Sequence, residues 1–176
     1  IRQAFREATT GTPGPVHLDI LGTRGEAVTK KESRLEIFAE RRYKSYPAFR
    51  IEPETELVRD AFDLIRYARR PVIIAGTFAT RSNWFEKLNR LSLPVFSTAA
   101  AKGVVNERLR HAAGVFTGVG GPLAPEKKIL PQADLIVAIG LRHNEVLAVK
   151  PFDCPSIHLD PLGEDLEVAL YQTLGF

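Results

Sequence analysis

Short runs of consecutive apolar residues constrain this chain more than any other feature. Residues 72–76 read VIIAG and residues 135–140 read LIVAIG. Apolar runs of this length, without alternation, are typical of strands that are buried on both faces of a parallel sheet. Residues 94–98 and 156–160 are two further strand candidates. The chain is therefore expected to build a sheet that is covered on both sides.

Helical patterns lie between these strands. Apolar residues recur at helical spacing over residues 53–68, and Ser82 or Asn83 is placed to cap a second helix that runs to residue 91. Further short helices are predicted over residues 122–130 and 166–174. This alternation implies right-handed crossovers, so the expected fold is a doubly wound, Rossmann-like parallel α/β sheet with helices on both faces.

The first fifty residues follow a different plan. Residues 1–9 have the spacing of an amphipathic helix, and residues 16–21, VHLDIL, alternate as in a strand. No period is sustained over residues 22–52, where acidic and basic residues interleave. We therefore expect a domain boundary in this stretch.

Composition excludes several classes of protein. Of 176 residues, 44% are hydrophobic and 26% are charged, as in an ordinary globular domain rather than a disordered chain. The net charge of +3 is too small to indicate nucleic-acid binding. No apolar run approaches the ~20 residues that span a membrane, and no secretory signal is visible, so we expect a cytoplasmic protein. One cysteine, Cys154, excludes an internal disulfide and a cysteine metal cluster.

Ligands of such sheets bind beyond the carboxyl ends of the strands, and the residues found there are the candidate site. The candidates for cofactor binding are Gly76, Thr98, Lys102, Gly103, Gly118, Gly140, Arg142 and Asp160. No catalytic constellation and no metal-ligand set is visible among the residue patterns, so we expect neither.

Each candidate has a second interpretation. Arg142 could bind a diphosphate or pair with Glu145, and Asp160 could accept hydrogen bonds from ribose or cap the next turn. Lys102 could contact phosphate or be an ordinary surface lysine. The glycines could admit a phosphate or only permit tight turns.

Several segments, in order, resemble the thiamine-diphosphate-dependent enzymes of the acetolactate synthase, pyruvate oxidase and benzoylformate decarboxylase type. The segments are residues 11–16 (GTPGPV), 69–76 (RRPVIIAG), 93–98 (LPVFST) with 101–104 (AKGV), 133–140 (ADLIVAIG) and 157–160 (IHLD). The resemblance implies a central, non-catalytic domain over residues 53–165. It also implies that residues 1–21 end a pyrimidine-binding domain, that residues 22–52 are a linker, and that residues 166–176 begin a linker to a diphosphate-binding domain.

The same resemblance implies the chemistry of a longer parent enzyme. The parent would cleave or form a carbon–carbon bond next to a 2-oxoacid carbonyl, using thiamine diphosphate and Mg held by other domains. This chain alone would be inactive, and the parent would be a homodimer or homotetramer that binds neither nucleic acid nor membrane.

Central domains of this family differ in what they bind, so FAD or ADP is a possible ligand here. The flavin-binding pattern has a Gly-Gly pair where this chain has Thr77 and Phe78, and Phe78 could block a ligand. Two alternatives therefore stay open: a free-standing FAD module of the electron-transfer-flavoprotein type, and a structural spacer of a 2-oxoacid decarboxylase.

Overall fold

The computed structural model describes residues 1–11, 13–19, 39–45, 48, 52–147 and 152–160. The chain divides into two compact units, Ile1–Arg50 and Ile51–Phe176. Among the described residues, no helix has both the length and the apolar character that a membrane span requires. The predicted helix over residues 166–174 lies outside the described residues.

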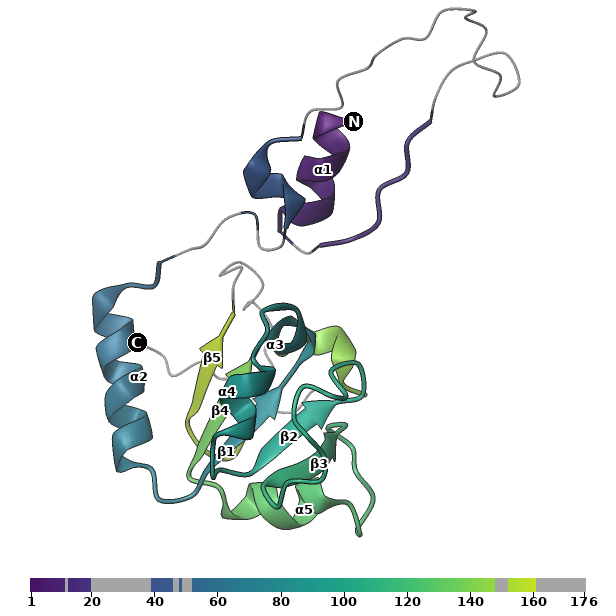
Figure 1. Cartoon of the computed structure of the whole chain (residues 1–176). Helices are drawn as coiled ribbons and strands as arrows, with labels where there is room; N and C mark the ends of the chain where they lie inside the picture. The colour runs from purple at the N-terminus through teal and green to yellow at the C-terminus, as the bar shows by residue number, and fades with distance from the viewer. Residues whose placement is uncertain (12, 20–38, 46–47, 49–51, 148–151, 161–176) are drawn as a thin grey trace, which may run out of the picture. The chain divides into compact units, whose positions relative to one another are not determined.

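The first unit contains helix α1 (Arg2–Thr9) and the short 3-10 helix η1 (Arg41–Lys44) (Figure 1). The guanidinium groups of Arg6 and Arg42 both bind Glu40, and both lie over the Tyr43 ring at 5.3 and 5.5 Å from its centroid. Helix α1 confirms the helix predicted from the spacing of residues 1–9.

The strand predicted over residues 16–21 is wrong for the part that the structure describes. Residues 13–19 form no strand there, and Val16 and Leu18 are 40% and 50% exposed. A lone strand has no stability in water without a neighbour to pair with. Residues 20 and 21 lie outside the described residues.

The second unit is a five-stranded parallel sheet with helices (Figure 1). Its elements are α2 (Thr55–Tyr67), β1 (Pro71–Ala75), α3 (Thr77–Arg81), α4 (Phe85–Asn89), β2 (Val95–Thr98), β3 (Ala112–Phe116), α5 (Pro125–Ile129), η2 (Leu130–Gln132), β4 (Leu135–Ile139), η3 (His143–Glu145) and β5 (Ser156–Leu159). This arrangement confirms the predicted doubly wound α/β fold.

The strand order, β3-β2-β1-β4-β5, places the first strand in the middle. The chain runs outward from β1 through β2 to β3, returns to β4 on the other side of β1, and then continues to β5. The direction of winding therefore reverses between β1 and β4. In open parallel sheets this switch point, at the carboxyl ends of the strands, is where ligands bind.

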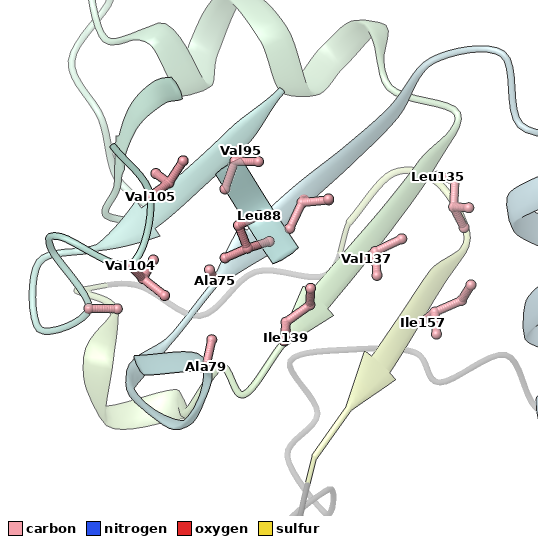
Figure 2. Close-up of a cluster of buried hydrophobic side chains, with 12 residues drawn as sticks. Ala75, Ala79, Leu88, Val95, Val104, Val105, Leu135, Val137, Ile139 and Ile157 are labelled. Atoms are coloured by element: carbon pink, nitrogen blue, oxygen red, sulfur yellow. The ribbon is translucent and has the colours of Figure 1, made fainter. Parts of the chain in front are cut away.

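Both faces of the sheet are buried, as the apolar runs predicted. On one face, alternate residues of β1 and β4 lie in one cluster with Leu88 of α4 (Figure 2). Ala61 and Leu64 of α2 pack against this cluster. On the other face, Ile74, Phe96 and Ile136 pack with residues of α5 and η2. Every residue of β4 is buried, which explains why its sequence shows no alternation.

Three elements differ from the prediction. Strand β3 was not among the predicted strands, because its residues AAGVF are mostly small and Gly114 has a φ of +108°. The helix predicted from Ser82 or Asn83 to residue 91 is present as α4 but is shorter, and helix α3 was not predicted. Helix α3 ends at Arg81, Asn83 adopts a φ of +58°, and α4 begins after Trp84.

Candidate functional site

The loops that follow β1 and β4 touch each other at the switch point. The Gly76 N–H donates to the Ile139 carbonyl at 2.9 Å, and the Phe78 N–H donates to the Gly140 carbonyl at 3.1 Å. A Cβ atom on Gly76 would lie 2.5 Å from the Leu141 Cα, and one on Gly140 would lie 2.6 Å from the Ala79 nitrogen. The two predicted glycines thus allow one loop to pack directly against the other.

A carboxylate joins the ends of three neighbouring strands. Glu145, in η3 after β4, accepts hydrogen bonds from the Thr77 N–H at 2.8 and 3.0 Å. The same carboxylate accepts a hydrogen bond from the hydroxyl of Thr98, which ends β2, at 2.6 Å. Sequence reasoning considered Glu145 only as a partner for Arg142, and the one signal for it was an acid in the turn after a buried strand.

Arg142 and Asp160 come together at the ends of β4 and β5. The Arg142 Nη1 and Asp160 Oδ2 atoms lie 3.5 Å apart, and the side chains are 11% and 8% exposed. The Arg142 guanidinium also lies 4.6 Å from the centroid of the buried Phe78 ring. Both charged groups therefore have contacts within the protein.

A second carboxylate occupies the glycine-rich loop after β3. Glu126 of α5 is 3% exposed, and it accepts hydrogen bonds from the Thr117 N–H at 2.7 Å and the Thr117 hydroxyl at 3.0 Å. The Thr117 hydroxyl in turn accepts the Gly120 N–H at 3.1 Å. Gly118, a predicted phosphate contact, takes a φ of +78° in this turn. The loop is folded around Glu126.

The remaining candidates lie in the loop after β2. Lys102 is 60% exposed along its side chain and lies 3.9 Å from the Glu107 carboxylate. Gly103 has a φ of +91°, which a turn requires and which glycine adopts readily. The Ala101 N–H donates to the Thr98 hydroxyl at 3.2 Å, so this loop connects to the Glu145 cluster through Thr98.

The described carboxyl edge does not fit the diphosphate of FAD or ADP. Such a group needs backbone N–H donors that point toward it and a positive field. Here the N–H groups of Thr77 and Thr117 already donate to carboxylates, which would repel a phosphate. Two cavities, of about 490 and 380 Å³, lie near the beginnings of β1 and β4, at the opposite edge of the sheet.

Two titratable side chains near β5 have shifted pKa values. Burial lowers the pKa of His158 to about 4, so its imidazole is neutral at pH 7. Burial also raises the pKa of the half-buried Cys154 thiol, which keeps it protonated. Among the residues that the structure describes, no three His, Cys, Asp or Glu side chains are grouped to hold a metal.

Comparison with known proteins gives one consistent result. Residues 58–170 match the family model "Thiamine pyrophosphate enzyme, central domain". A probable acetolactate synthase large subunit of Methanococcus aeolicus is 30% identical over 90% of this chain and 27% of its own length. The acetolactate synthase isozyme 1 large subunit of Escherichia coli is 31% identical over 89% of this chain and 27% of its own length. Pyruvate decarboxylase isozyme 2 of Saccharomyces cerevisiae is 37% identical over 51% of this chain and 16% of its own length.

This chain spans about a quarter of the length of the acetolactate synthases that it matches. The family model covers well over half of the chain and includes all five strands of the sheet. The predicted resemblance is therefore confirmed: the chain belongs to the thiamine pyrophosphate enzymes, and its parallel sheet is their central domain.

Proposed function

We propose that this chain serves as the non-catalytic central domain of an acetolactate synthase-like enzyme that acts on 2-oxoacids. The observation that carries the proposal is the similarity to acetolactate synthase large subunits over 82% to 90% of the chain. When bound, thiamine diphosphate supplies a carbon nucleophile and an electron sink to the parent enzyme. That cofactor and Mg would be held by neighbouring domains.

In the parent enzyme, the role of this domain is to support the neighbouring domains that hold the cofactor. Its sheet is buried on both faces, and the polar groups at its carboxyl edge bind one another. A domain of this kind supplies a rigid body on which other domains can be positioned. The expectation that the parent is a homodimer or homotetramer stays a prediction.

Pyruvate decarboxylation is the second candidate activity of the parent. It is favoured by the 37% identity over 94 residues to pyruvate decarboxylase isozyme 2 of yeast. The alternative of a free-standing FAD module has no support, because the matching model describes one domain of a thiamine pyrophosphate enzyme. Binding of FAD or ADP by this domain stays a prediction, and the contacts of Glu145 and Glu126 argue against it.

The products of the parent distinguish the two activities. We expect the parent, purified from its source and supplied with pyruvate, thiamine diphosphate and Mg, to form acetolactate. Release of free acetaldehyde as the main product would instead support the decarboxylase. The 176-residue chain alone should form neither product. Turnover by the chain alone, above a protein-free blank, would show that the assignment as a non-catalytic domain is wrong.

A further inference from the structure

We infer that the Glu145 carboxylate takes the place of a ligand phosphate at the switch point, so that this domain holds no nucleoside diphosphate or dinucleotide there. The starting point is the location of Glu145. Its carboxylate lies among the ends of β1, β2 and β4, which is the edge where a parallel sheet binds its ligand.

The hydrogen bonds of Glu145 are those that a phosphate oxygen would make. One backbone N–H, from Thr77, and one hydroxyl, from Thr98, both point at the same anionic group. The Thr98 hydroxyl contact at 2.6 Å and the shorter Thr77 N–H contact at 2.8 Å have the lengths of charge-assisted hydrogen bonds. A phosphate can reach these donors only if the carboxylate leaves.

Other groups of the two loops contact one another beside Glu145. The Gly140 carbonyl accepts the Phe78 N–H, so the backbone of one loop fills the space beside the other. The side chain of Phe78 is 2% exposed, with the Arg142 guanidinium over its ring. Arg142, the residue best suited to bind a diphosphate, is therefore turned toward Phe78 and Asp160.

Glu126 repeats the arrangement one strand away. Its buried carboxylate accepts the N–H of Thr117, the first residue after β3, just as Glu145 accepts the N–H of a residue after β1. Two strand ends are thus each closed by an acidic side chain of the chain itself. Because the same contact occurs at two strand ends, a chance approach of a single carboxylate does not explain the position of Glu145.

The test compares ligand binding by the whole chain and by two variants. Glu145→Ala removes the carboxylate, and Glu86→Ala removes an equal charge from an exposed position on α4. ADP and FAD are titrated calorimetrically into each protein. We expect at most weak binding of ADP by the unchanged chain and by Glu86→Ala, and binding of ADP by Glu145→Ala that is roughly ten- to a hundredfold tighter. The contacts of Glu145 all lie within this domain, so the test measures ligand binding and does not depend on the activity of the parent enzyme.

Two outcomes would overturn the inference. One is micromolar binding of ADP or FAD by the unchanged chain. The other is identical binding by the unchanged chain and a folded Glu145→Ala variant, since the carboxylate would then not be what excludes the phosphate.

A second variant covers the case in which Glu145→Ala does not fold. Glu145→Gln keeps the shape of the side chain and removes its charge. The amide proton of Thr77, followed by NMR, should then move upfield because its charged acceptor is gone. Glu86→Gln should leave that signal in place. An unmoved Thr77 signal in Glu145→Gln would show that the contact does not exist and would overturn the inference.

Discussion

At position 76, glycine is required by a neighbouring loop and not by backbone conformation. Gly76 has a φ of −102°, which any residue can adopt, yet a Cβ there would lie 2.5 Å from the Leu141 Cα. We predict that Gly76→Ala lowers the free energy of unfolding by roughly 1–3 kcal/mol, because the two loops must move apart. Urea denaturation measures this change.

Gly121 offers the matched control. A Cβ at Gly121 would have no atom within 4 Å, so Gly121→Ala should change the free energy of unfolding by no more than about 0.5 kcal/mol. Equal losses in the two variants would mean that the close packing at Gly76 is not the cause.

The buried imidazole of His158 makes stability depend on pH. Its folded pKa of about 4 lies below its ordinary value of 6.5, so the unfolded chain binds the proton first as pH falls. The contribution of His158 is therefore fully present above pH 6.5, declines as pH falls from 6.5 to 4, and declines no further below that. We predict a loss of roughly 3 kcal/mol over this window.

Urea denaturation at a series of pH values tests this prediction. Hydrogen bonds lower the pKa values of the Asp134 and Glu40 carboxylates. Protonation of these carboxylates as pH falls therefore also lowers the free energy of unfolding. Comparison with His158→Gln separates the two effects, because this variant keeps the carboxylates. If His158→Gln lost as much stability between pH 6.5 and 4 as the unchanged chain, the prediction for His158 would be contradicted.

At the scale of elements, the break between α3 and α4 depends on Asn83. This residue has a φ of +58°, a left-handed conformation that asparagine tolerates and β-branched residues avoid. We predict that Asn83→Val destabilises the domain by roughly 1–2 kcal/mol and that Asn83→Gly is neutral or slightly stabilising. Thermal unfolding of the two variants checks this, and a smaller loss for Val than for Gly would contradict it.

The elements that could be predicted from the sequence are the strands whose residues are nearly all large and apolar. The runs at β1 and β4 consist of large apolar residues, and strands buried on both faces need such residues. Strand β3 could not be found this way, because Ala112, Ala113 and Gly114 have little strand preference and are held in place by β2. The helix predicted from Ser82 or Asn83 begins later, after Trp84, because Asn83 takes the left-handed conformation with a φ of +58°.

For the molecule as a whole, the sequence predicted which residues meet but not what they bind. Thr98 ends a strand and Gly76, Gly140, Arg142 and Asp160 follow strands, so a parallel sheet brings them to one edge. The direction in which Arg142 points depends on the path of its loop and on the Phe78 ring, which no spacing rule specifies. The same holds for Glu145, whose partners are Thr77 at the start of α3 and Thr98 at the end of β2.

The position of β1 in the middle of the sheet has a consequence for how this protein is made. Strand β1 pairs with β4, and Asp134, just before β4, accepts the Arg70 N–H across 64 positions of chain. A ribosome adds about 5–20 residues per second, so β1 waits roughly 3–13 s for this neighbour. During that interval its nearly fully buried residues, Val72 to Ala75, have no β4 to cover them. The nascent chain therefore passes through a stage at which chaperones, or other nascent chains, can reach its central strand.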